Sequence, residues 1–139
     1  MSEKRRVLIL CTGNSARSQM AEGLLRALAG GRFEVESAGT RPSGLRPEAV
    51  EAMRETGVDI SRQRSKSVDE FAGQRFDYVV TVCDNAREEC PVFAAGTRRV
   101  HWSFEDPAAV VGDEGERLAA FRRVRDEIAE RLRAWLEEV

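Results

Sequence analysis

Apolar residues occur in short continuous runs that alternate with segments of helical spacing. The run from Val7 to Leu10 is apolar at every position, which is typical of a strand buried on both faces of a parallel sheet. Further strand-like runs cover residues 33–37, 76–82 and 98–102. Because strands alternate with helical segments, the pattern predicts an α/β fold with a parallel sheet, right-handed crossovers and helices on both faces.

Two helices are indicated by apolar residues spaced three and four apart. The first should end at Gly30 and carries Met20, Leu24, Leu25 and Leu28. The last helix is the most regular, with Arg and Glu opposite an apolar stripe. That stripe consists of Leu118, Phe121, Val124, Ile128, Leu132 and Trp135. We expect both stripes to face the core.

Two shorter helices are indicated by their end signals. Pro47 suits the first turn of a helix, and Gly57 is placed to end it. Ser67 with Glu70 forms a capping-box pattern, which predicts a short helix through Phe71.

Chemically active residues follow three of the predicted strands. Cys11 ends the first strand, Cys83 ends the third, and Asp106 lies in a loop after the fourth. In parallel α/β sheets, sites form beyond the carboxyl ends of the strands. We therefore expect these three side chains to converge, although they are far apart in sequence.

The composition indicates the number of domains, the location of the protein and the class of partner. A chain of 139 residues, 42% hydrophobic and 33% charged, suits one soluble domain over residues 1–139. No apolar run has the length of a membrane span or a signal peptide, so we expect a cytoplasmic protein. The net charge is −2, with basic residues spread along the chain, which gives no footprint for nucleic acid.

The three cysteines and one histidine narrow the chemistry further. Three cysteines are too few for a structural disulfide framework, and in a cytoplasmic protein they are buried thiols, metal ligands or redox groups. His101 lies in an apolar run, and no Cys-x2-Cys pair accompanies it. We therefore expect a structural His101 and no metal site.

The loop from Cys11 to Arg17 has the spacing Cys-x5-Arg between a strand and a helix. Gly13 and Asn14 tolerate the positive φ of a tight loop, which can turn its N–H groups inward as an anion nest. Arg17 adds a bidentate fork, and Ser18 either donates to Cys11 or caps the helix. The nest should lower the pKa of Cys11 and favour the nucleophilic thiolate. The predicted oxyanion-binding residues are Thr12, Gly13, Asn14, Ser15, Ala16, Arg17 and Ser18.

Residues 11–22, CTGNSARSQMAE, closely resemble the signature of arsenate reductases built on the low-molecular-weight protein tyrosine phosphatase fold. The order of elements is similar over nearly the whole chain, which implies a four-stranded parallel sheet. Asp106-Pro107 resembles the loop that carries the family's general acid. Residues 82–91 look like the Cys-x6-Cys redox segment of the thioredoxin-coupled reductases, which implies redox roles for Cys83 and Cys90.

The resemblance implies a complete cycle. Cys11 attacks arsenate while Asp106 acts as general acid, and Cys83 then attacks Cys11 to release arsenite. Cys90 moves the disulfide to Cys83, from which reduced thioredoxin removes it by exchange. We therefore expect arsenate and thioredoxin as partners, no tightly bound cofactor, and a monomer.

The sequence departs from the family pattern in two places. Ala16 stands where many relatives have a second cysteine, which leaves the reductase route intact. Some members bind potassium beside the loop, through residues that match Asn14, Glu22 and Ser37 plus a Thr and an Asp near position 65. Here Arg64 and Lys66 occupy the last two positions. A side-chain cation can replace the ion there, and we expect no potassium site.

Two other functions use the same loop. A low-molecular-weight phosphatase needs no electrons, and against it stand the Cys83–Cys90 pair and an Arg41–Gly44 loop without aromatic residues. A non-catalytic oxyanion sensor would not need the general acid that Asp106 implies. Arsenite release in the presence of thioredoxin separates the three functions.

Overall fold

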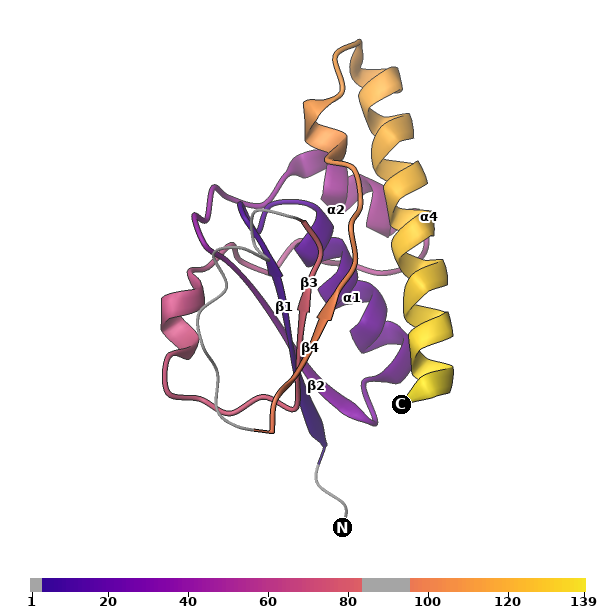
Figure 1. Cartoon of the computed structure of the whole chain (residues 1–139). Coiled ribbons are helices and arrows are strands. Elements are labelled where there is room, and N and C mark those ends of the chain that lie inside the picture. The colour runs from indigo at the N-terminus through magenta and orange to yellow at the C-terminus, as the bar shows by residue number, and fades with distance from the viewer. Residues whose placement is uncertain (1–3, 84–95) are drawn as a thin grey trace.

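The computed structural model describes residues 4–83 and 96–139. Its elements in chain order are β1 (Arg5–Cys11), α1 (Arg17–Ala29), β2 (Phe33–Gly39), α2 (Pro47–Arg54), the 3-10 helix η1 (Val68–Phe71), β3 (Tyr78–Thr81), β4 (Arg98–His101), the 3-10 helix η2 (Pro107–Ala109) and α4 (Glu114–Glu138). Cys90 lies outside the described residues. Figure 1 shows this order as colour along the chain.

The strands form one parallel sheet in the order β2-β1-β3-β4. β1 is an inner strand that pairs with β2 along its whole length and with β3 from Val7 to Leu10. The side chains of Val7 to Leu10 are at most 1% exposed, because both faces of this strand are covered. The predicted four-stranded parallel α/β fold is confirmed.

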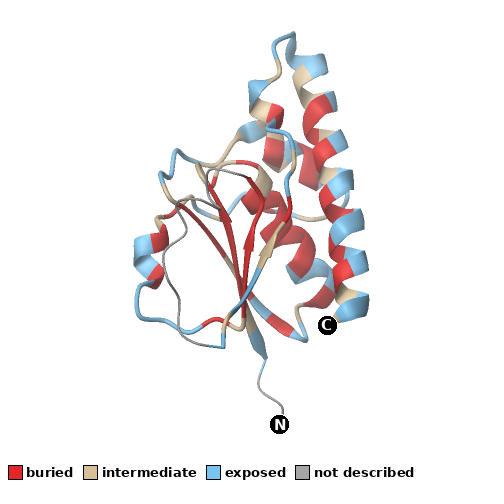
Figure 2. Cartoon of the chain, in the orientation of Figure 1, coloured by how far each residue is buried: buried red, intermediate tan, exposed pale blue. Residues whose placement is uncertain are grey.

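The α-helices pack on one another as well as on the sheet. α1 contacts α2 and α4, and α2 contacts α4, whereas η1 lies across the sheet from α4 (Figure 1). Figure 2 shows buried residues along the strands and along one side of α4. The rings of Phe33, Tyr78 and Trp102 lie 5.5, 5.1 and 5.9 Å from the ring of Trp135. This aromatic cluster fixes α4 against the sheet, as its apolar stripe predicts.

Two local predictions differ from the structure. Leu28 is 40% exposed, because Ala29 takes the core-facing position in the last turn of α1. Ser67 caps η1 by accepting from the N–H of Asp69 at 3.1 Å, while the carboxylate of Glu70 pairs with Arg64. The segment is therefore a capped 3-10 helix without the reciprocal bond of a capping box.

The α-helices of the described part of the chain are too short or too polar to cross a membrane.

Candidate active site

The loop after β1 is held open by hydrogen bonds on its outer side. The carbonyls of Thr12, Gly13 and Ser15 each accept a 2.9 Å bond from the backbone N–H of Arg41, Ser43 and Arg46, respectively. In a planar peptide the N–H points opposite to the carbonyl. The intervening N–H groups of the loop therefore face the other way, as an anion nest requires.

Backbone conformation and close packing also shape this loop. Asn14 has φ 47°, the left-handed conformation that Asn tolerates better than most residues. Gly39, at the end of β2, lies so close that a Cβ there would come within 2.5 Å of the Thr12 carbonyl oxygen. A larger residue at position 39 would push the loop out of shape.

The loop forms the floor of a cavity of about 470 Å³. The residues that line this cavity are Cys11, Thr12, Gly13, Ser15, Ala16, Arg17, Ser43, Arg46, Asp106 and Ala108. The structure therefore brings together the cysteine, the arginine and the carboxylate that the sequence singles out. Asn14 and Ser18 are fully buried and support the loop from below.

Arg17 connects the loop to the segment after β4. Its Nη1 donates to the backbone carbonyl of Phe104 at 3.0 Å, and its Nη2 lies 3.9 Å from Oδ2 of Asp106. The Asp106 carboxylate also accepts from the N–H of Ala108 at 3.0 Å, as the N-cap of η2. The Asp106 side chain is 46% exposed and lines the cavity.

Cys83 lies directly beside the loop. Its Sγ is 3.3 Å from Oγ1 of Thr12, the residue that follows Cys11. Both Cys11 and Cys83 are buried, at 3% and 5% exposure. Both are free thiols, and Cys83 raises the pKa of Cys11.

The pKa of Cys11 is shifted opposite to the sequence expectation. The hydrogen bond to Cys83 and burial raise this pKa above its ordinary value, and together they outweigh the lowering by Arg17 and by the Thr12 N–H. Burial penalises the thiolate, and a neighbouring sulfur competes for the same proton.

Removing the Cys83 sulfur should lower the pKa of Cys11. Cys83→Ala deletes the first raising cause and leaves Arg17 in place, so the thiolate should form at lower pH. Alkylation by iodoacetamide requires the thiolate, and its rate against pH reports this change. The comparison is Cys83→Ala/Cys90→Ser against Cys90→Ser, with mass spectrometry to follow Cys11. Superimposable profiles would show that Cys83 does not control Cys11.

Ser18 does not cap α1, and its hydroxyl has a partner that the sequence did not indicate. Its hydroxyl accepts from Nδ2 of Asn14 at 2.8 Å, and α1 is preceded by Ala16, which makes no side-chain cap. Asn14 also donates to Ser37 and accepts from the Lys66 N–H, each at 3.0 Å. Ser18 is therefore part of a buried network that fixes Asn14. Its donation to Cys11 stays a prediction.

A buried cation lies under this network. Glu22 is 3% exposed; its Oε1 accepts from the Ser37 hydroxyl at 2.5 Å and lies 3.7 Å from Nζ of Lys66. Arg64 instead pairs with Glu70 at the surface. The ammonium of Lys66 thus occupies the surroundings in which the family resemblance implies a metal cation. No cluster of three or more potential metal ligands occurs among residues 4–83 and 96–139.

Several site residues carry no signal in the sequence. Ser43, Arg46 and Ala108 line the cavity, and Ser65 donates to the Gly13 carbonyl at 3.1 Å. In the sequence, Arg46 is only the residue before a predicted helix, and Ser43 and Ser65 are ordinary loop residues. These residues reach the site from other parts of the chain, so only their spatial position identifies them.

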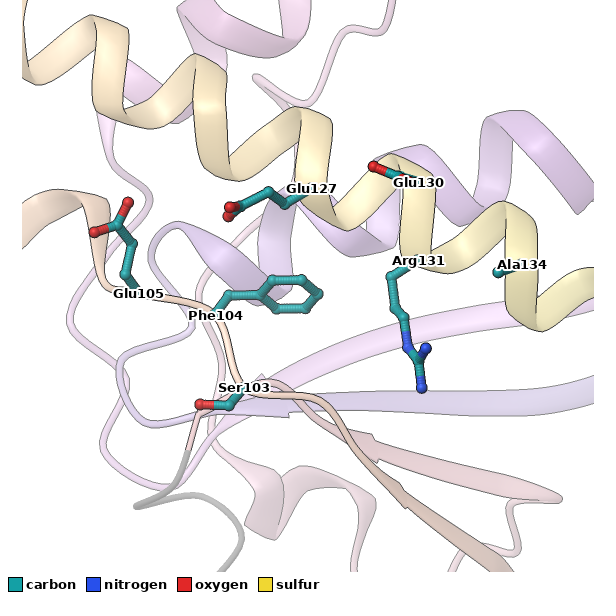
Figure 3. A pocket seen from close by; sticks show the side chains of 7 residues that line it. All are labelled: Ser103, Phe104, Glu105, Glu127, Glu130, Arg131 and Ala134. Carbon is teal, nitrogen blue, oxygen red and sulfur yellow. The ribbon is translucent and has the colours of Figure 1, made fainter.

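A second cavity, of about 480 Å³, lies between α4 and the segment after β4. It is lined by Ser103, Phe104, Glu105, Glu127, Glu130, Arg131 and Ala134. Figure 3 shows the Phe104 ring projecting into it, beneath the helix that carries Glu127 and Arg131. Its lining contains no cysteine. It touches the first site through Phe104, whose carbonyl holds Arg17.

The comparisons with known proteins agree on one family. Residues 6–139 match the low molecular weight phosphotyrosine protein phosphatase family. The arsenate reductase of Halalkalibacterium halodurans is 47% identical over 134 residues, or 96% of each chain.

Two solved structures show the fold. A thioredoxin-dependent arsenate reductase of Corynebacterium glutamicum is 30% identical with a TM-score of 0.77, over 99% of this chain and 62% of that one. A low molecular weight protein tyrosine phosphatase from T. tengcongensis is 26% identical with a TM-score of 0.81, over 98% of this chain and 100% of that one.

Proposed function

The chain belongs to the low molecular weight phosphotyrosine protein phosphatase family, as one of its arsenate reductases, and from this membership we propose that a three-cysteine relay recharged by thioredoxin carries its reaction. The observation that supports the relay most directly is the position of Cys83, whose Sγ lies 3.3 Å from Oγ1 of Thr12 in the loop that carries Cys11. Hydrolysis of a phosphate ester requires no second thiol, whereas reduction requires one to accept the sulfur bond.

The first step is attack on the oxyanion. The loop N–H groups and Arg17 bind monohydrogen arsenate over Cys11, whose sulfur forms a bond to arsenic as the bond from arsenic to its hydroxyl breaks. Asp106 gives its proton to this departing hydroxyl, which leaves as water, and the proton lost by the Cys11 thiol restores Asp106. The product is a Cys11–arsenic(V) adduct.

The second step supplies the electrons. The Cys83 sulfur attacks Cys11, a disulfide forms between them, and the electron pair of the sulfur–arsenic bond leaves with arsenic as arsenite. Two thiols are thereby oxidised to one disulfide while arsenic gains two electrons. Cys90, outside the described residues, attacks Cys83 in turn and frees Cys11, and thioredoxin reduces the Cys83–Cys90 bond. A relay that must return to thiols suits the reducing cytoplasm, where we expect the protein to act as a monomer.

Phosphatase activity is the second candidate, because a tyrosine phosphatase has the same fold and the cavity binds phosphate by the same groups. Phosphate and arsenate differ little in shape and charge. The difference lies in the product, since only the reductase route consumes thiols.

One paired assay tests the proposed function. We expect NADPH consumption when arsenate is added to the protein with thioredoxin and thioredoxin reductase, at a rate well above hydrolysis of p-nitrophenyl phosphate. The control omits thioredoxin and should give at most one arsenite per protein molecule. Sustained p-nitrophenyl phosphate hydrolysis without arsenite formation would identify a phosphatase instead.

A further inference from the structure

Arg46 is a second arginine at the candidate active site, and its side chain has no polar partner in the described part of the chain. It lines the same cavity as Cys11 and Arg17. Its backbone N–H donates to the Ser15 carbonyl at 2.9 Å, which ties this residue to the oxyanion loop. Arg17, by contrast, is already engaged with the Phe104 carbonyl and faces Asp106.

The position of Arg46 is unfavourable for the helix that follows. Arg46 is the N-cap of α2, with φ −78° and ψ 132°, and its side chain makes no capping hydrogen bond. N-caps favour Ser, Thr, Asp and Asn, which accept from the free N–H groups of the first turn. A guanidinium at this end also meets the positive pole of the helix dipole. A residue that destabilises its own helix, with no neighbouring contact to offset this effect, indicates a functional role.

The charges around the cavity indicate which ligand would compensate for the unfavourable position of the Arg46 guanidinium. Its ionisable lining residues are Cys11, Arg17, Arg46 and Asp106, so two of the four carry a guanidinium group. These two cations, together with the loop N–H groups, suit a tetrahedral anion with two negative charges better than one with a single charge.

We propose that Arg46 is an oxyanion-binding residue that first binds the dianionic form of the substrate, which then moves to the N–H groups of the oxyanion loop. This inference rests on the proposed function and deepens it by naming the ionic form of the oxyanion. An arginine from the segment before α2 and an arginine from α1 thus reach one anion from two separate elements. Arg46 is free to move to the anion, because it has no competing contact to break among the described residues.

The test uses Arg46→Ser, which removes the guanidinium and supplies a favourable N-cap. Inorganic phosphate is the probe, with calorimetric binding to the reduced full-length protein. We expect binding about 10-fold weaker than in the unaltered protein, from the loss of one charge-assisted contact. Without phosphate, the Tm should rise by about 2–6 °C because the N-cap is improved. A purely structural role for Arg46 would move Tm down.

Arg54→Gln is the matched control. Arg54 ends the same helix, pairs with Glu51 at 2.8 Å and is 64% exposed, so its loss removes the same charge away from the cavity. Phosphate affinity should be unchanged in this variant, and Arg46→Lys should fall between Arg46→Ser and the unaltered protein. Equal losses in Arg46→Ser and Arg54→Gln, or none in Arg46→Ser, would overturn the proposal.

Two further measurements test the preference for the dianion and the proposed function separately. The penalty of Arg46→Ser should be larger above the second ionisation of phosphate, near neutrality, than below it; equal penalties would overturn the preference for the dianion. Phosphate binding does not depend on arsenate reduction. An unaltered protein that binds phosphate through Arg46 but forms no arsenite would therefore contradict the proposed function and leave the assignment of Arg46 standing.

Discussion

Cys11→Ser should abolish arsenite production while oxyanion binding survives. A serine hydroxyl is a far weaker nucleophile than a cysteine sulfur at neutral pH. The loop carbonyls stay bound by residues 41–46, and Arg17 keeps its contact with the Phe104 carbonyl, so the anion nest should persist.

The measurement combines single-turnover arsenite release with phosphate binding. We expect a loss of at least about 10⁴-fold in rate, the scale seen when a nucleophile is removed, and phosphate affinity close to that of the unaltered protein. Thermal unfolding serves as the folding control, because the substitution is nearly isosteric. Arsenite formation by Cys11→Ser at more than a trace would remove Cys11 from the proposed role.

Cys83→Ser and Cys90→Ser should stop the cycle at different steps. Cys83→Ser removes the sulfur that attacks Cys11 in the proposed relay, so the arsenic adduct should persist without arsenite release. Cys90→Ser should release about one arsenite per molecule and then hold a Cys11–Cys83 disulfide, since no third thiol is left to attack it.

Mass spectrometry after one equivalent of arsenate separates the two variants. The disulfide in Cys90→Ser should appear as a loss of two hydrogens and as a cross-linked pair of peptides containing Cys11 and Cys83. Reduction by dithiothreitol should restore one further turnover, which is the control for an intact site. Repeated cycling of Cys90→Ser with thioredoxin and no trapped bond would rule out the three-cysteine relay.

The sequence by itself determined the elements that depend on neighbouring residues. A run of apolar side chains at every position specifies an inner strand, and β1 has this character from Val7 to Leu10. Spacings of three and four specified the buried side of α4, including Phe121 and Trp135. The Cys-x5-Arg spacing between a strand and a helix likewise located the loop that lines the cavity, because the end of the strand, the tight-loop residues and the start of the helix are neighbours in sequence.

Local sequence patterns gave wrong predictions where a property of a residue depends on how other elements pack around it. Leu28 fits the apolar spacing of α1 but is 40% exposed, since helical periodicity does not say how far along a helix the core extends. The pKa of Cys11 was expected to fall because the nest is visible in the sequence. Cys83 follows a different strand, β3, and its side chain together with burial raises the pKa of Cys11.

Only the tertiary structure decided which distant side chains complete the site. Lys66 rather than Arg64 reaches Glu22, although the two cations are two positions apart and equally plausible in sequence. Arg46 reaches the cavity because the chain after β2 folds back over the loop, where its backbone N–H meets the Ser15 carbonyl. Such contacts join residues that are far apart along the chain, so their geometry follows from how the elements pack, and neither spacing nor composition encodes it locally.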